Sequence, residues 1–247
     1  MFAMPIIASV AAFMLLAPTP DTVVEDETGL RFAAELQAPG GPAGERMQQL
    51  LGTGCREKFW INVYAYGLYI DRVEAHDALS QLVEGTGKVK MSVKDVARIN
   101  VPSISRSVRL VMVRDVDGED MREAFEDFLG ARLKTRGTKA AQKKSFANLA
   151  VFRDYFANDV SDGTELVFVW RAARGADSPG TLTTKIAGRV VGSQAAPDLA
   201  WALFDCYVGK DPISEDSVED MARDLPKALR AGAKEEQAEA AKVAEKR

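Results

Sequence analysis

The sequence predicts an α+β fold in which helices pack against one face of an antiparallel sheet. Two observations predict it. Several segments alternate their side chains with the period of two that is typical of β-strands, and turn-forming residues separate them. Other segments place apolar residues three or four positions apart, as amphipathic helices do. A layer of helices on one face of a sheet buries both kinds of apolar surface in a single core.

Several segments have the alternating pattern of β-strands. The segment Val23–Phe32 predicts a pair of strands that turns at Thr28-Gly29, because glycine supplies the positive φ that such turns need. A longer strand is expected from Phe59 to Ile70. Both of its faces are largely apolar or aromatic, which predicts a central strand covered on both sides. The remaining strand candidates are Val89–Val93, Arg109–Val113, the segment ELVFVWRA after Gly163-Thr164, and a hairpin return at Leu182–Val191.

The helix candidates follow from the spacing of their apolar residues. The clearest is Glu119–Leu133, which comes after a turn at Asp117-Gly118 and whose apolar stripe consists of Met121, Phe125, Phe128 and Leu129. Without further evidence, such a stripe is expected to pack in the protein core. The other candidates are His76–Val83, about Lys139–Ala157, a helix that begins at Pro197 with Leu199, Leu203, Cys206 and Tyr207 inward, and about Glu215–Ala231.

The two ends of the chain differ from the part between them. Residues 1–17 form a continuous, uncharged apolar run. It is shorter than the ~20 residues of a spanning helix and has the length of the apolar region of a signal peptide. We expect residues 1–20 to be a signal peptide, or else an N-terminal anchor, and the protein to be exported to the periplasm. An apolar N-terminal strand is the alternative. We expect one domain over 22–231 and a charged, flexible or helical tail over 232–247.

Composition excludes several classes of function. The 247 residues are 47% hydrophobic, carry a net charge of −4 and show no dense basic face, so we expect no nucleic-acid partner. With one histidine, His76, which we expect at the surface, and two distant cysteines, a zinc site of the usual ligands is nearly excluded. No phosphate-loop, dinucleotide or nucleophile-elbow motif is present, and we expect no cofactor. Cys55 and Cys206 are expected to be buried thiols, with a disulfide as the alternative.

Four segments carry a family resemblance. The first is EDETGLRF, and the second is LGTGCREKFWINVYAYGLYID at Leu51–Asp71, with a G-x-G-x-R turn before a long strand that ends in a G-[LV]-Y. The third is RLVMVRDVDGEDMREAF, and the fourth is GSQAAPDLAWALFDCYVGKDPIS, which ends in a G-x-[DN]-x-[IV]-S turn. In this order they resemble the chalcone isomerase family over about Val24–Ala231. The resemblance implies that family's open-faced β-sandwich, with a cleft between the sheet and the helices.

The resemblance also suggests which branch of the family this chain is similar to. The isomerase site has an Arg after the glycines, a Thr on the central strand, and a Tyr and an Asn on the helix that follows. The Arg is kept as Arg56, whereas the other three positions hold Tyr64, Met121 and Phe128. This pattern looks like the fatty-acid-binding branch, where an Arg and a Tyr of this segment hold the ligand carboxylate.

The side chains are chemically suited to that role. Arg56 can hold a carboxylate with two parallel N–H bonds, and the Tyr64 hydroxyl can add a third donor. An apolar wall for an acyl chain would come from Met121, Phe125 and Phe128. Arg56 could instead be a surface residue at the start of a strand, and the tyrosines of this strand could be core.

We therefore expect an exported protein that binds a fatty acid or similar apolar carboxylate in the cleft without catalysis, so that no residue is assigned a catalytic role. One alternative is an intramolecular lyase that closes a ring, as chalcone isomerases do. Another is an envelope interaction protein whose cleft is filled by its own side chains. Membrane contact is expected only through the N-terminal segment, if that segment is not removed.

Overall fold

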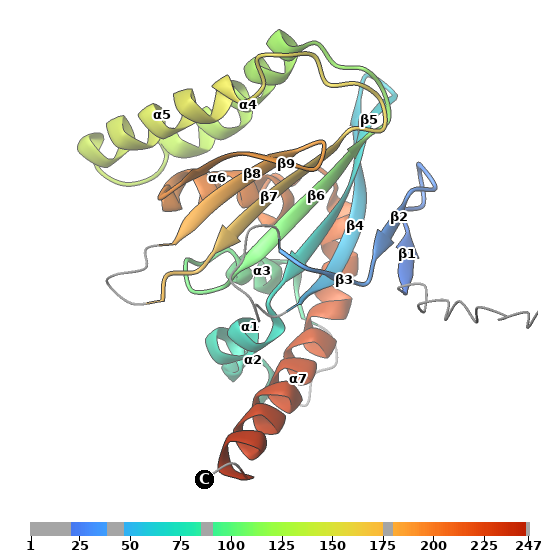
Figure 1. Cartoon of the computed structure of the whole chain (residues 1–247), viewed down its shortest axis with the longest axis vertical. Coiled ribbons are helices and arrows are strands. Elements are labelled where there is room, and N and C mark those ends of the chain that lie inside the picture. Colours follow the sequence, from blue (N-terminus) through green and yellow to red (C-terminus); the bar gives the residue numbers. More distant parts are fainter. Residues whose placement is uncertain (1–20, 39–46, 85–90, 175–179, 246–247) are drawn as a thin grey trace, which may run out of the picture.

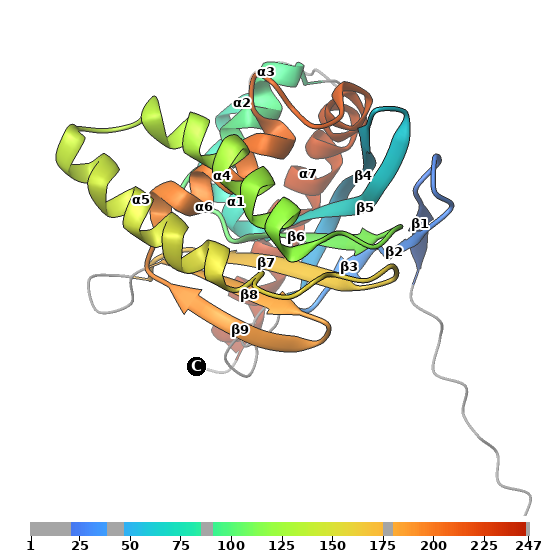
Figure 2. The ribbon, with the colours of Figure 1, turned by 90° about the horizontal axis from the view of Figure 1, so that it is seen from above.

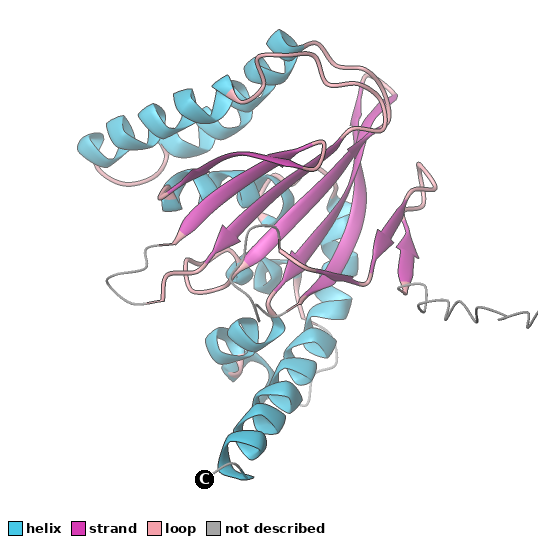
Figure 3. Cartoon of the chain, viewed as in Figure 1, coloured by secondary structure: helices cyan, strands magenta, loops and turns pink. Residues whose placement is uncertain are grey.

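The computed structural model describes residues 21–38, 47–84, 91–174 and 180–245. Its main feature is a seven-stranded antiparallel sheet in which each strand pairs with its neighbour in sequence (Figures 1 and 3). The strands are β3 (Glu35–Leu36), β4 (Gln48–Lys58), β5 (Ile61–Ile70), β6 (Arg106–Met112), β7 (Glu165–Arg171), β8 (Thr181–Ile186) and β9 (Arg189–Gln194). A separate hairpin pairs β1 (Thr22–Val24) with β2 (Arg31–Ala33). The predicted α+β class is confirmed.

The helices cover one face of the sheet, as Figure 2 shows from above. They are α1 (Arg72–Leu79), α2 (Gln81–Glu84), α3 (Val93–Val96), α4 (Gly118–Lys134), α5 (Lys139–Asp154), α6 (Pro197–Val208) and α7 (Glu215–Glu245). The core lies between the two layers. Its sheet side includes Tyr66, Leu68 and Phe168, and its helix side includes Leu199 and Leu225. None of the helices in the described part of the chain combines the length and hydropathy that a bilayer-spanning segment requires.

Several expected elements are confirmed. The hairpin of β1 and β2 turns where predicted, with Gly29 at a φ of 70°. β5 lies between β4 and β6 in the middle of the sheet, and the side of β5 away from the helices is also covered, because Phe32 packs against Gly67. Cys55 and Cys206 are both buried free thiols.

The start of the family-like segment was placed wrongly. Gly52 and Gly54 do not form a turn but lie inside β4, an eleven-residue strand. The turn comes later, at Phe59 and Trp60, so β5 begins at Ile61 rather than at Phe59. Close packing explains the glycines: a Cβ on Gly52 would lie 2.7 Å from Cγ of Met221 on α7. A side chain at these positions would push α7 away from the sheet.

This packing gives a stability prediction with opposite signs at two glycines. A Cβ on Gly54 would lie 2.8 Å from Oη of Tyr66 and 2.9 Å from Cβ of Ser217, so Gly54→Ala should lower the free energy of unfolding by about 1–3 kcal/mol. Gly130, within α4, has no atom nearer than 3.6 Å to such a Cβ. Gly130→Ala should therefore raise the free energy of unfolding by up to about 1 kcal/mol, through helix propensity. Urea unfolding measures both, and an unchanged stability of Gly54→Ala would contradict the packing argument.

Two other expectations were wrong, and a third was right only in part. Val93 does not end a strand but begins α3, because the Ser92 amide donates to the Asp95 carboxylate at 3.0 Å and the pair caps the helix; residues 85–90 lie outside the described ranges. The segment Leu182–Val191 does contain the expected hairpin return, since β8 pairs antiparallel with β7, but the chain turns again after Ile186 and its last residues belong to β9. The last helix does not end near Ala231, since α7 continues to Glu245.

The extension of α7 also corrects the expectation for His76. His76 does not lie at the surface but is half-buried beneath α7. A Cβ added to Gly232 of α7 would lie 3.0 Å from the Cβ of His76. Arg72, one turn earlier on α1, forms an ion pair with Glu235 of α7. The last helix was expected to end near Ala231, so there was no reason to expect from the sequence that a helix covers His76.

Candidate ligand-binding site

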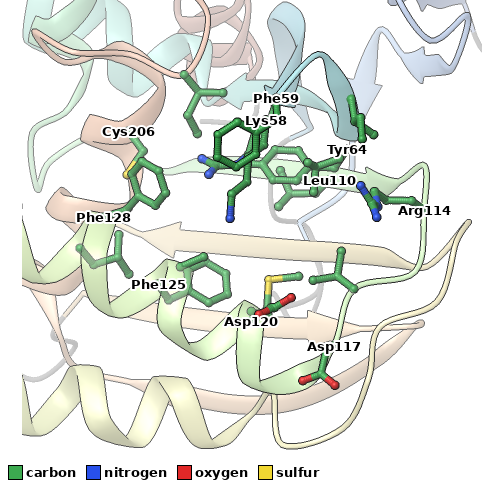
Figure 4. Close-up of a pocket in the computed structure, with 18 of the residues that line it drawn as sticks. Lys58, Phe59, Tyr64, Leu110, Arg114, Asp117, Asp120, Phe125, Phe128 and Cys206 are labelled. Carbon is green, nitrogen blue, oxygen red and sulfur yellow. The ribbon is translucent and has the colours of Figure 1, made fainter.

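A cavity of about 330 Å³ lies between α4 and the ends of β4, β5 and β6 (Figure 4). Its volume is near the lower end of the ~300–1,000 Å³ that is typical of small-molecule sites. The five side chains expected from the sequence to form a ligand site all line it: Arg56, Tyr64, Met121, Phe125 and Phe128. The structure thus brings together residues from two strands and one helix, and their role in binding a ligand stays a prediction.

The pairing of β4 with β5 sets Arg56 beside Tyr64. The two residues are direct partners across these antiparallel strands, just before an irregularity in the register. Arg56 is half-buried, and the central carbon of its guanidinium lies 4.2 Å from the centre of the Phe128 ring. Arg56 is therefore not a surface arginine. Within the described ranges, no carboxylate forms an ion pair with it.

One hydroxyl lies next to this guanidinium, that of Tyr64, and a second hydroxyl lies beside the first. The Tyr64 hydroxyl is 3.4 Å from that of Tyr207, a residue of α6 whose ring packs edge-on against Tyr66 at 4.8 Å. Burial raises the pKa of Tyr64 to about 12, although the positive charge of Arg56 opposes the shift. Burial likewise raises the pKa of Tyr207 well above its ordinary value. Both side chains stay neutral at physiological pH and can donate a hydrogen bond to an anion.

Cys206 lies one position before Tyr207 and also lines the cavity. Burial raises the pKa of its thiol to about 12, and the positive charges of Arg132 and Arg56 only partly oppose this. The thiol is therefore protonated at neutral pH and is a poor nucleophile. Its hydrogen bond to the Ala202 carbonyl, at 3.4 Å, holds it against its own helix.

The apolar wall is fixed in place by α4. The helix begins at Gly118, where the Asp117 carboxylate accepts from the Glu119 amide at 2.7 Å. Near its other end, Arg132 donates to Asp205 of α6 at 2.9 Å. Phe125 is anchored among other aromatic rings, with ring centres 4.7 to 6.0 Å away at Phe152, Phe156 and Phe168. The wall is therefore held in place by the contact with α6 and by the aromatic rings behind it.

The charges that line the cavity are unevenly distributed. Arg56 and Lys58 belong to β4, and the adjacent Arg114 and Asp115 belong to the connection between β6 and α4. Asp117 and Asp120, at the start of α4, lie across the cavity from Lys58 (Figure 4). The middle is apolar, with Val63, Leu110 and Ala124 among its lining residues. An anion is attracted to the β4 side and repelled from the start of α4. A molecule with an anionic head and an apolar tail can satisfy both the charged and the apolar surfaces.

The comparisons with known proteins decide the family. The sequence model of the family described as "Chalcone isomerase like" matches residues 46–222, which is most of the chain. The chain belongs to the chalcone isomerase-like family. Its fold agrees, since the crystal structure of a fatty-acid binding protein from Arabidopsis thaliana superposes on this chalcone isomerase-like protein with a TM-score of 0.70 and 21% identity. That match covers 85% of this chain and 99% of the other, and confirms the expected fold.

Two curated relatives are similar in sequence. Fatty-acid-binding protein 2 of Arabidopsis thaliana is 28% identical over 211 residues, which are 81% of this chain and 50% of the relative. Fatty-acid-binding protein 1 of the same plant is 24% identical over 209 residues, or 81% of this chain and 69% of the relative. The chalcone isomerase-like chain thus spans about half the length of the first of these relatives.

Sequence reasoning missed part of the site. Tyr207 and Cys206 were expected only as inward residues of a helix, and Ile61, Val63 and Leu110 were not singled out. The spacing of Leu203, Cys206 and Tyr207 was a usable signal for an inward face. That signal does not distinguish a residue that lines a cavity from one that packs in the core, because both are shielded from water.

Proposed function

We propose that this protein binds a fatty acid, or a similar apolar carboxylate, in the cavity between α4 and the sheet, and releases it unchanged. The observation that carries the proposal is the guanidinium of Arg56. It faces an apolar cavity beside two neutral hydroxyls, and no carboxylate among the described residues pairs with it. A ligand carboxylate would complete this arrangement with charge-assisted hydrogen bonds.

The names of the relatives support the same ligand. Both Arabidopsis proteins that match this chain in sequence are called fatty-acid-binding proteins, and so is the protein of similar fold. Each sequence match extends over 81% of this chain, and the family model itself spans residues 46–222, which include all the segments that form the cavity. An amphipathic acid therefore agrees both with the names of the relatives and with the distribution of charge in the cavity.

The chemistry of the lining favours binding over ring closure. Burial keeps Tyr64, Tyr207 and Cys206 protonated, so these groups can donate hydrogen bonds but cannot accept a proton from a substrate at neutral pH. The positions that resemble the isomerase Tyr and Asn are Met121 and Phe128, which have no proton to exchange. A cavity of about 330 Å³ also counts against a cleft filled by its own side chains.

Export is part of this proposal. It rests on the apolar run of residues 1–17, which lies outside the described ranges. An exported carrier would hold its ligand in the periplasm, and residues 21–245 contain the whole proposed site. The binding proposal does not depend on where the protein is located.

A chain-length series tests the binding function. The delipidated protein is titrated calorimetrically with saturated fatty acids of increasing length. Affinity should rise by about 0.8 kcal/mol, or about fourfold, for each added CH₂ that the apolar wall buries. It should level off once the cavity is full, because a cavity of about 330 Å³ is small. Absence of saturable binding, or an affinity independent of chain length from the shortest acid onward, would refute the proposal.

A further inference from the structure

The turn between β4 and β5 exposes three large apolar side chains in a row. We call residues 58–61 the hairpin tip. The exposed fractions of its apolar side chains are 82% for Phe59, 94% for Trp60 and 51% for Ile61. Exposed tryptophan is unusual in a soluble domain, and three adjacent exposed apolar residues form a patch that normally marks an interaction site.

The backbone of the hairpin tip makes these aromatic residues more unusual. Lys58 pairs with Ile61, so that Phe59 and Trp60 form a two-residue turn, with φ of 52° and 65°. Both residues occupy the left-handed region, which glycine and asparagine adopt easily and bulky side chains adopt at a cost. Since the two rings are exposed, this cost is not repaid by packing in the core. If stability alone mattered, Asn-Gly would be the favoured sequence for this turn. The presence of two aromatic residues instead indicates that their rings contact a partner outside the chain.

The hairpin tip also forms the rim of the cavity. Lys58, Phe59 and Ile61 line it, together with Arg114 of the connection that follows β6 (Figure 4). Val113 of this connection donates its amide to the Val63 carbonyl at 3.1 Å, which holds the connection against β5. Whatever binds the hairpin tip therefore lies at the entrance of the cavity.

The size and chemistry of the tip indicate a bilayer rather than a protein. A stable protein interface buries about 1,200 Å² or more and uses some twenty residues on each side, whereas the tip offers three apolar side chains on a narrow turn. A bilayer accepts such a wedge, and tryptophan prefers the boundary between head groups and acyl chains. Lys58 and Arg114, both exposed, can reach lipid phosphates. Glu57 and Asp115, also exposed, offset part of this attraction, so apolar insertion provides most of the binding.

We propose that the hairpin tip inserts into the surface of a lipid bilayer and holds the mouth of the cavity against the lipid. The inference rests on the proposed function for its purpose, since a fatty acid could then pass between bilayer and cavity without crossing water. Its evidence is separate, because insertion needs no ligand in the cavity. This contact is made by residues 58–61 and so differs from the one expected through the N-terminal segment.

The test uses the full chain, phosphatidylcholine vesicles with and without phosphatidylglycerol, and the fluorescence of Trp60. The difference between the emission of the wild type and that of Trp60→Ser isolates this residue. On addition of vesicles the difference signal should shift to shorter wavelength, and lipids brominated on their acyl chains should quench it. Trp60→Ser should weaken vesicle binding by about tenfold, the effect of exposing one aromatic side chain.

The controls separate this inference from the proposed function. Val190→Ser removes a side chain that is 54% exposed on β9, away from the cavity, and should bind vesicles as the wild type does. Trp60 does not line the cavity, so Trp60→Ser should bind a soluble fatty acid with unchanged affinity. An unquenched Trp60, or equal vesicle binding by Trp60→Ser and wild type, overturns the inference and leaves the proposed function intact. Vesicle binding through Trp60 without any fatty-acid binding would support the inference and refute the proposed function.

Discussion

Replacing Arg56 by glutamine is expected to weaken the binding of a fatty acid by at least about tenfold. The variant keeps a polar side chain of moderate length but removes the charge, so the ligand carboxylate loses its charge-assisted hydrogen bonds. The neutral hydroxyls of Tyr64 and Tyr207 remain, and they do not replace a cation in an apolar cavity. Titration calorimetry of the delipidated variant measures the loss.

Arg136 provides a matched control. Its guanidinium carbon lies 4.4 Å from the centre of the Trp201 ring, much as Arg56 lies over Phe128, but Arg136 does not line the cavity. Arg136→Gln should therefore bind the ligand with wild-type affinity. If Arg56→Gln and Arg136→Gln bind equally well, the anion is not held by Arg56.

Filling the cavity is expected to have an effect of similar size. Ala124 lines the cavity from α4, and a phenylalanine at this position would occupy space that the acyl chain needs. Ala124→Phe should weaken the binding of long-chain acids by more than about tenfold. The ring enters an existing cavity and buries apolar surface there, so the melting temperature of the ligand-free protein should be maintained or raised.

The same substitution on the outer face of α4 is the control. Ala131 is exposed, and Ala131→Phe should change neither the affinity nor the folded structure. Competition with a fluorescent fatty acid compares the two variants at equal protein concentration. Full binding by Ala124→Phe would mean that the acyl chain lies somewhere other than in this cavity.

The sequence predicted most elements because their causes are local. The apolar stripe of Met121, Phe125 and Phe128 predicted α4, and Gly29 predicted the first hairpin. The errors came from contacts between distant segments. Gly52 and Gly54 resemble turn glycines, yet they are glycines because α7, more than 160 residues later, packs on β4. No local pattern carries that information.

The site was predictable to a similar extent. The family resemblance identified Arg56 and Tyr64, and the structure places both beside one cavity. Tyr207 and Cys206 could not be identified in the same way, because an inward helical face looks alike whether it borders a cavity or a packed core. The exposure of Trp60 was also hidden, since its aromatic neighbours favoured a strand. Only the register of β4 with β5 puts Phe59 and Trp60 in a turn.

Ligand binding depends on recognition of an anionic head group by Arg56 at the end of an apolar cavity. The most direct measurement compares a fatty acid with the alcohol of equal chain length, in wild type and in Arg56→Gln. We expect the wild type to prefer the acid by at least about tenfold. Arg56→Gln should remove this preference while binding the alcohol as before. Equal affinity of the wild type for acid and alcohol would contradict this expectation.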